Sequence, residues 1–337
     1  MTVNSPPVFY TPRHLAHDPD SNHADQPARA ELLLSAALGY GLVAHEPQDW
    51  GMSPIGAVHS SGLLAFMQTA YRRFAQLPEG ARPAVPDGFA VRELGNYLPR
   101  NIWGQLGHYC TDNLTPILED TWTAAYWAAQ TALSAAAAVA DGATLGYGLC
   151  RPPGHHAYND LYGGYCYLNN AAIAAQWLVE RGHRPAILDI DYHHGNGTQA
   201  IFYERPDVFF CSIHADPEDE YPYYCGFAHE TGSGLGEGFT LNLPLPLDTG
   251  PQAYLHAVAR SLAAVDAFAP DVLVLSLGFD IIAGDPHGGL RLGPETFADI
   301  GRALAELRRP LLLIQEGGYL LPALGPALTA LLAGING

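Results

Sequence analysis

The chain has 337 residues, of which 48% are hydrophobic and 15% charged, and its formal net charge is −18. The apolar content is ample for a buried core, while the acidic excess argues against binding a nucleic-acid backbone, which needs clustered Lys and Arg. No apolar stretch reaches the roughly 20 residues of a membrane span, and the N-terminus lacks a basic-then-apolar secretory signal. The five cysteines, an odd number without CxxC spacing, suit reduced residues of the core. We therefore expect a cytoplasmic protein that binds neither nucleic acid nor membrane.

Short apolar runs alternate with helical patterns along the chain. The apolar runs, which read as strands buried on both faces, are 143–150, 185–190, 207–213, 271–277 and 310–315. The helical patterns are 121–140, 168–182, 252–268 and 294–308. This alternation predicts an α/β fold with right-handed crossovers and helices on both faces of a mostly parallel sheet. We expect residues 1–337 to form a single domain.

Two segments stand outside the alternation. Residues 14–26 are rich in His, Asp and Asn, but their spacing fits no metal-ligand set, so we expect a solvated loop. Residues 78–116 carry several prolines and glycines between two helical segments. Because long irregular segments in compact domains are usually functional, we expect 78–116 to form an interaction surface.

Each apolar run ends in a cluster of polar or glycine residues. The clusters are RPPGHH (151–156), DYHHGNG (191–197), HAD (214–216), GFD (278–280) and EGGY (316–319). Open α/β sheets place their sites just beyond the carboxyl ends of their strands. The pattern therefore predicts an enzyme whose active site collects these five clusters at one edge of the sheet.

A catalytic metal site is predicted from three of these residues. Asp191 and His193 lie two positions apart at a strand end, so their side chains leave the same face, and Asp280 arrives from another strand end. Two carboxylates and one imidazole leave positions open for water and substrate, as in catalytic zinc sites. The same oxygen-rich set also suits Fe(II).

The adjacent pair His155 and His156 supplies a candidate base. Two neighbouring histidines are costly to bury unless both are hydrogen-bonded, and Asp189 and Asn196 are the available partners. A histidine paired with a carboxylate has a raised pKa, whereas one facing an amide stays nearer its usual value. The pair therefore predicts one cationic group and one general base.

Tyr319 follows two glycines after a buried strand, so its phenol can lean over the metal. Opposite a Lewis acid, a phenol that donates to an oxyanion stabilises a tetrahedral intermediate. With a metal, a base and this phenol, the site predicts amide hydrolysis by direct attack of water. No Gly-Xaa-Ser-Xaa-Gly elbow is present, which argues against a covalent acyl-enzyme.

These motifs, together with GGYCYLNN (163–170), ILDIDYHHGNGTQ (187–199) and GDP (284–286), resemble the histone deacetylase family of zinc amidohydrolases. The likeness is greatest to its bacterial acetylpolyamine amidohydrolase branch. It implies an arginase-like α/β domain around an eight-stranded sheet. It also implies one zinc per chain on Asp191, His193 and Asp280, with His156 as base and His155 paired to Asp189. Tyr319 would polarise the acetyl carbonyl.

The resemblance extends to further groups. It implies a structural potassium ion held by the Ser212 side chain with Asp189 and with the backbone of Asp191 and His193. It also implies that Arg29 lines an internal acetate channel. The implied substrate-binding residues are Gly164, Tyr165, Tyr224 and Gly317. In this branch an extended loop mediates dimerisation and narrows the tunnel, and residues 78–116 occupy that position, so a homodimer is implied.

The chain departs from the branch at two places that bear on substrate choice. Where the branch carries a glutamate to meet a distal ammonium, this chain has Trp103, and Glu93 is a candidate replacement. Trp103 would either stack on the substrate or pack in the dimer interface. After GDP the chain has His287, where related enzymes place leucine or glutamate. Both departures affect substrate preference and leave the chemistry unchanged.

The leading hypothesis is a zinc-dependent deacetylase of small cationic amines such as acetylputrescine, acetylcadaverine and acetylspermidine. The alternatives are an acetyl-lysine deacetylase and a hydrolase of another small acylamide. A binding module on an inactive scaffold is disfavoured because every ligand, both histidines and Tyr319 are present. An arginase-type ureohydrolase would need a two-metal site with more acidic ligands.

Overall fold

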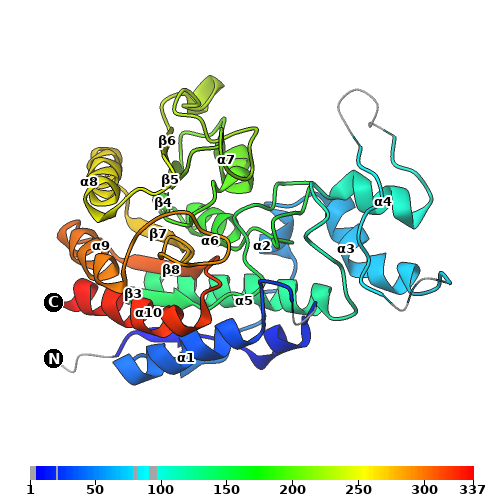
Figure 1. Ribbon diagram of the computed structural model, residues 1–337, viewed down its shortest axis with the longest axis horizontal. Coiled ribbons are helices and arrows are strands. Elements are labelled where there is room, and N and C mark those ends of the chain that lie inside the picture. The colour runs from blue at the N-terminus through cyan, green and yellow to red at the C-terminus, as the bar shows by residue number, and fades with distance from the viewer. Residues whose placement is uncertain (1–4, 20–21, 79, 81, 91–96) are drawn as a thin grey trace.

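The computed structural model describes residues 5–19, 22–78, 80, 82–90 and 97–337. Within these residues, eight strands form one all-parallel sheet in the order β2-β1-β3-β8-β7-β4-β5-β6, which confirms the predicted fold class (Figure 1). The strands are β1 (Pro7–Phe9), β2 (Val43–His45), β3 (Leu145–Gly148), β4 (Pro185–Asp189), β5 (Phe209–Ala215), β6 (Thr240–Leu245), β7 (Val272–Leu277) and β8 (Leu311–Gln315).

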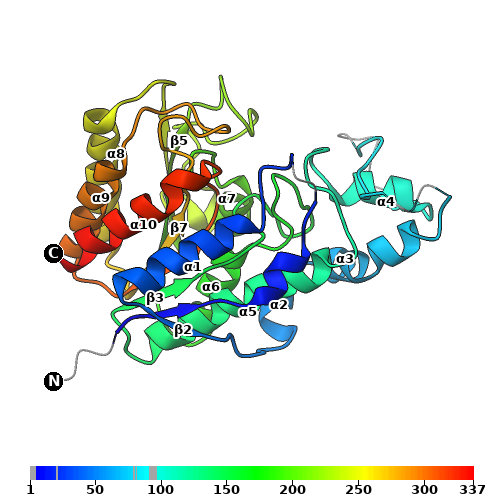
Figure 2. The same ribbon diagram turned by 60° about the horizontal axis from the view of Figure 1, so that its bottom comes forward.

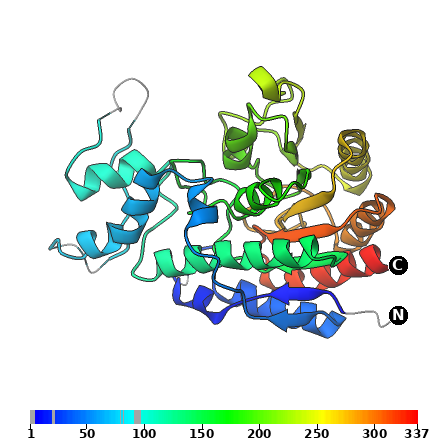
Figure 3. The same ribbon diagram turned by 180° about the vertical axis from the view of Figure 1, so that it is seen from behind.

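Helices cover both faces of the sheet. One layer, in front in Figure 2, contains α1 (Ala28–Tyr40) and α10 (Leu321–Asn336), with α8 (Pro251–Phe268) and α9 (Pro294–Glu306) beside them. The opposite layer, seen from behind in Figure 3, is dominated by α5 (Thr121–Ala140), with α6 (Asn170–Val179) packed against it. The remaining helices are η1 (Pro12–Ala16), α2 (Ser53–Gly56), α3 (Ser61–Phe74), α4 (Ile102–Tyr109), α7 (Asn196–Phe202) and η3 (Gly234–Gly236). The α3–α4 segment extends from one end of the layered body (Figure 1).

The strand sequences explain why the sheet is covered twice. Successive side chains of a strand point to opposite faces. Ile187 in β4 and Val274 in β7 pack into the core under α5 and α6, whereas Leu188 and Leu275 pack into the core under α8, α9 and α10. Because both faces bury apolar side chains, the strands read as continuous apolar runs, and this is the signal that locates them in the sequence.

Three strands escape the sequence prediction. β1 and β2 have three residues each, and the side chains of β2 are exposed, so no apolar run marks them. β6 (TLNLPL) lies at the other edge of the sheet and includes Asn242 and Pro244, which interrupt the apolar pattern. Edge strands need less apolar surface, because one side has no neighbouring strand.

The solvated loop predicted for residues 14–26 is wrong. His14, His17 and Asp25 are buried, with at most 1% of their surface exposed. Asp25 accepts a hydrogen bond from Arg29 and lies 3.2 Å from the Arg151 Nε atom. Part of the polar composition of this segment therefore reflects a buried charge cluster, while Asp18 and Asn22 are exposed. None of the described helices is long and apolar enough to cross a bilayer.

Candidate active site

The polar clusters meet at the carboxyl edge of the sheet. The order β3-β8-β7-β4-β5 places five predicted strands side by side. His155 and His156 follow β3, Tyr319 follows β8, Asp280 follows β7, and Asp191 follows β4. Because the strands are parallel, all these side chains leave the sheet at one edge, as the sequence predicts.

Asp191, His193 and Asp280 converge as a candidate metal-ligand set. The His193 Nδ1 atom lies 3.3 Å from Asp191 Oδ1 and 3.4 Å from Asp280 Oδ2. Four ligands around a zinc ion at bonds of about 2.0–2.2 Å lie about 3.3–3.6 Å apart, so this spacing fits a shared ion. Asp280 Oδ2 is buried without a hydrogen-bond partner among the described residues. Burial and then the nearby Asp191 carboxylate raise the pKa of Asp280 to about 7, so a cation here would relieve the charge repulsion.

Backbone groups orient two of these ligands. The Gly317 N–H donates to Asp191 Oδ2 at 2.8 Å, and the Tyr192 N–H donates to Asp280 Oδ1 at 3.0 Å. A β-carbon on Gly317 would lie 2.5 Å from Asp280 Oδ2, so the position requires glycine. Gly317 was predicted to bind substrate, but the structure places it against the two carboxylates.

The two histidines have the predicted partners. His155 Nδ1 lies 3.0 Å from Asp189 Oδ2, and His156 Nδ1 lies 2.7 Å from Asn196 Oδ1. The Asn196 amide nitrogen donates to the Tyr158 hydroxyl at 3.1 Å, which leaves its oxygen to accept from His156. His156 therefore carries its proton on Nδ1 and presents a free Nε2 lone pair.

The two histidine rings differ in their pKa and therefore in their charge. Burial disfavours protonation of His155, but Asp191 and Asp189 outweigh burial and raise its pKa well above the usual value. Burial and then the neighbouring His155 hold the pKa of His156 well below its usual value. One ring is therefore cationic and the other neutral, which is the asymmetry predicted from the sequence.

Tyr319 is held by a carboxylate that the sequence analysis did not assign. Asp285 Oδ2 accepts from the backbone N–H groups of Tyr319 and Leu320 at 2.7 and 2.9 Å. Asp285 Oδ1 accepts from the His287 N–H at 2.9 Å, so one buried side chain ties the loop after β7 to the loop after β8. Gly318, which precedes Tyr319, has φ +112°, and a β-carbon added to it would lie 2.5 Å from the β-carbon of Phe279. In the sequence, Asp285 could have been found through the motif GDP (284–286), of which it is the central residue.

These groups open into a cavity of about 670 Å³, a size typical of small-molecule sites. The Tyr165 ring stands at 5.8 Å from that of Tyr319, and Gly164 lies against the His156 ring, where a β-carbon would approach to 2.3 Å. Tyr221, which the sequence analysis missed, stacks edge-on against His156 at 4.9 Å. Tyr224 lines the cavity at its outer rim, where it is 90% exposed.

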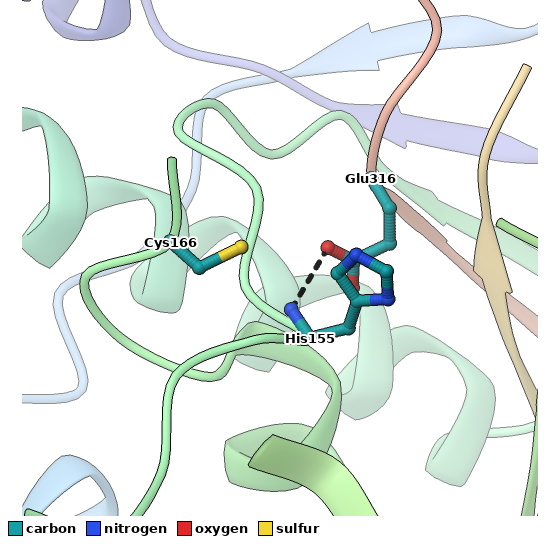
Figure 4. Close-up of side chains that lie close together, drawn as sticks. All are labelled: His155, Cys166 and Glu316. Carbon is teal, nitrogen blue, oxygen red and sulfur yellow. Dashed lines mark hydrogen bonds between the residues drawn. The ribbon is translucent and has the colours of Figure 1, made fainter. Parts of the chain in front are cut away.

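Glu316 supports the histidine loop from behind. Its Oε2 atom accepts from the backbone N–H group of Gly154 at 2.6 Å. It also accepts from the backbone N–H group of His155 at 3.1 Å (Figure 4). Glu316, His155 and Cys166 lie close enough to resemble a second metal site. However, the Cys166 thiol donates to the Gly164 carbonyl, and burial and then Glu316 raise its pKa well above the usual value. His155, Cys166 and Glu316 therefore each have hydrogen-bond partners within the protein.

Arg29 approaches the site from α1. Its guanidinium donates to the carbonyls of Gly318 and Glu316 at 2.6 Å each and lies 4.8 Å from the centre of the Tyr319 ring. Asp25 lies between Arg29 and Arg151 and pairs with both. The first turn of α1, braced by Asp25, therefore supports the loop that carries Tyr319.

Among the described residues, Trp103 is the predicted substrate-binding residue that is not brought to the cavity. Trp103 in α4 packs its ring against Phe74 at 5.0 Å, and Arg82 lies over its face. Glu93 lies outside the described residues. His287, by contrast, lines the cavity, with its ring 5.1 Å from that of Tyr319.

Ser212 lies beside Asp189 in the β4–β5 register. Its hydroxyl is 2.8 Å from His214 Nδ1, and the other nitrogen of that ring is 2.8 Å from the Gly226 carbonyl. Because a carbonyl only accepts, His214 donates through Nε2 and must accept from Ser212. The serine oxygen therefore keeps its lone pairs free.

Comparison with known proteins agrees with this geometry. A histone deacetylase domain matches residues 23–335. The chain is 47% identical to an acetylpolyamine amidohydrolase of Burkholderia pseudomallei, over 87% of this chain and 85% of that protein. It is 41% identical to an acetylpolyamine amidohydrolase of Mycoplana ramosa, over 93% and 92% of the two chains. A crystal structure of the Burkholderia pseudomallei acetylpolyamine aminohydrolase superposes with a TM-score of 0.94 at 42% identity, covering 98% of this chain and 99% of that one. The chain therefore belongs to the histone deacetylase family.

Proposed function

We propose that this protein is a zinc-dependent deacetylase that hydrolyses the amide bond of acetylated polyamines and releases acetate and the free amine. The observation that carries the proposal is the convergence of Asp191, His193 and Asp280 on one point, with His156 and Tyr319 lining the same cavity. Relatives at 41–47% identity over most of the chain are acetylpolyamine amidohydrolases, which supports the substrate class.

Asp191, His193 and Asp280 would hold the catalytic ion, and Zn²⁺ is our assignment, with Fe(II) suited to the same ligands. When bound, such an ion polarises the acetyl carbonyl and lowers the pKa of a water ligand. The His156 Nε2 lone pair takes a proton from the attacking water and later delivers it to the leaving amine. The Tyr319 hydroxyl donates to the carbonyl oxygen, and charged His155 offsets the negative charge that develops.

We also propose a structural potassium site at Ser212. Its support is the free lone pairs of the serine oxygen and the adjacent, fully buried Asp189 carboxylate. Backbone carbonyls of Asp189, Asp191 and His193 would complete the site. Oxygen-only ligands of this kind suit hard cations.

A homodimer through residues 78–116 is part of the proposal. Support comes from four exposed apolar side chains of that segment, Phe89, Tyr97, Leu98 and Leu114, which are 40%, 78%, 44% and 50% exposed. Trp103 would then belong to the structure that presents this surface rather than to the cavity. We further propose that residues 1–337 act as one catalytic domain in the cytoplasm, supported by the single sheet and by five cysteines that form no disulfide.

Turnover on zinc-loaded protein tests the function. Acetylputrescine, acetylcadaverine and acetylspermidine would be compared with an acetyl-lysine peptide and a neutral acylamide. We expect kcat/KM to be highest for the acetylated amines. Higher kcat/KM for the peptide would identify an acetyl-lysine deacetylase instead, and no turnover on any substrate by metal-loaded protein would contradict the proposed reaction.

Asp285→Asn should lower kcat about tenfold, because it replaces a charged acceptor of the Tyr319 and Leu320 N–H groups and loosens the phenol. Steady-state kinetics of a double-mutant cycle check this. In a Tyr319→Phe background, Asp285→Asn should cost less than about twofold, since the group that it positions is already gone. A full tenfold loss in that background would show that Asp285 does not act through Tyr319. Asp248→Asn, which changes an exposed carboxylate, is the control.

A further inference from the structure

The cavity has an acidic character that the catalytic steps do not use. Among the described residues that line it, two carry carboxylates, Asp112 and Glu220, and none is Lys or Arg. Both carboxylates come from segments outside the five motif clusters. A cavity with this lining favours a cationic ligand. A carboxylate can bind that cation only if it has oxygen acceptors that the protein itself does not use, so the hydrogen bonds of the two carboxylates decide which of them can bind it.

Asp112 is fully occupied within the protein. Its Oδ1 accepts from the Leu114 N–H and the Thr115 hydroxyl at 2.8 and 3.0 Å. Its Oδ2 accepts from the Gly164 N–H and the Tyr221 hydroxyl at 2.6 and 3.2 Å. A carboxylate offers about four acceptor positions, and all four are taken. Asp112 therefore shapes the cavity wall and has no acceptor to offer a ligand.

Among the residues that the structure describes, two groups donate to the Glu220 carboxylate. Its Oε2 accepts from the Tyr192 hydroxyl at 3.0 Å, and its Oε1 accepts from the N–H of its neighbour Tyr221 at 3.2 Å. Each oxygen keeps one acceptor position, and the side chain is half-buried at the cavity. A half-buried carboxylate with free acceptors is suited to bind an ammonium group.

The sheet itself fixes Glu220 in this position. Tyr192 lies between Asp191 and His193 in the sequence, and its ring is fully buried in the core under α8, α9 and α10. Its hydroxyl donates to Glu220 and lies beside Gly289. A β-carbon on Gly289 would lie 2.6 Å from this hydroxyl, so glycine leaves room for it. The same strand end thus carries the metal ligands and, through Tyr192, sets the carboxylate at a fixed position relative to them.

We infer that Glu220 binds the distal ammonium of the substrate and makes the enzyme prefer acetylated amines with a second, charged nitrogen over neutral acetamides. The inference rests on the proposed function and adds the residue that recognises the charge. The acetyl group lies at the metal ligands while the amine end lies towards Glu220. Glu220 takes no part in the hydrolysis, so it affects binding of the cation and not the chemical step.

The test compares two substrates that differ only in charge. N-acetylputrescine carries a terminal ammonium, and N-pentylacetamide carries a methyl group in its place. In Glu220→Gln, KM for N-acetylputrescine should rise about tenfold with kcat retained, while kcat/KM for N-pentylacetamide stays within twofold. Glutamine keeps an acceptor for Tyr192, and the neutral substrate reports whether the variant is correctly folded. Asp219→Asn, an exposed carboxylate one residue away that does not line the cavity, is the matched control and should change neither substrate.

The possible outcomes separate the two proposals. If the wild-type enzyme prefers N-acetylputrescine and Glu220→Gln removes that preference, Glu220 is the recognition group. If the preference survives in Glu220→Gln, the inference is overturned and the proposed deacetylase function stands. If zinc-loaded wild-type protein hydrolyses neither substrate, the proposed function fails, and the inference about Glu220 fails with it.

Discussion

His156→Ala should lower kcat by about 10²–10⁴-fold while the protein still binds one zinc per chain. The expected loss follows from the free Nε2 lone pair of His156, which is the neutral nitrogen base facing the cavity. The Nδ1 atom only donates to Asn196, so removal of the ring deletes the base without touching a metal ligand. Steady-state kinetics and metal analysis of the same preparation check both parts.

Chemical rescue makes this result specific. The truncated side chain leaves a space for added imidazole, which should restore part of the turnover of His156→Ala. His256→Ala, an exposed histidine on α8, is the control and should behave as wild type. Near-normal turnover of His156→Ala would assign the base to another group, and His155 would be the first to test.

Tyr319→Phe should lower kcat about 10²–10³-fold with little change in KM or zinc content. The substitution removes a single hydroxyl, and the ring contacts with Tyr165, His287 and Arg29 are retained. The loss therefore reports on the hydrogen bond to the carbonyl oxygen, which is strongest when that oxygen becomes negative. Zinc analysis and kinetics on acetylputrescine measure it.

Tyr224→Phe is the matched control, because this tyrosine lines the same cavity but its side chain is 90% exposed at the rim. We expect its kcat to remain within twofold of the wild-type value. Equal effects of the two substitutions would show that a general change in the cavity, and not the phenol of Tyr319, explains the loss.

The sequence predicts those parts of the structure that depend on short stretches of chain. Strands β4 and β7 are apolar on both faces, so they stand out, and the polar residues that follow them locate the site. The partners of His155 and His156 are also predictable, since Asp189 and Asn196 lie in the adjacent motif and buried imidazoles need hydrogen bonds.

Contacts between distant segments were not predictable. Asp25 is 126 residues from Arg151, and without a fold a polar stretch containing it looks like a solvated loop. Tyr221 and Glu220 lie in an irregular segment after β5, where no periodicity indicates which side chains face the cavity. Asp285 belongs to a visible motif, but its role depends on the backbone of Tyr319, which arrives from another strand.

The hydrogen bonds of Asp285 to the loops after β7 and β8 bear on how protein engineering can alter the substrate range of this enzyme. They fix the wall that carries Tyr319 and His287, because one buried carboxylate holds the backbones of both loops. Random changes there would misplace the phenol. The outer rim of the cavity carries Tyr223 and Tyr224, which are 49% and 90% exposed. Libraries that vary those two positions would therefore change the mouth of the cavity while leaving the contacts of Asp285 untouched.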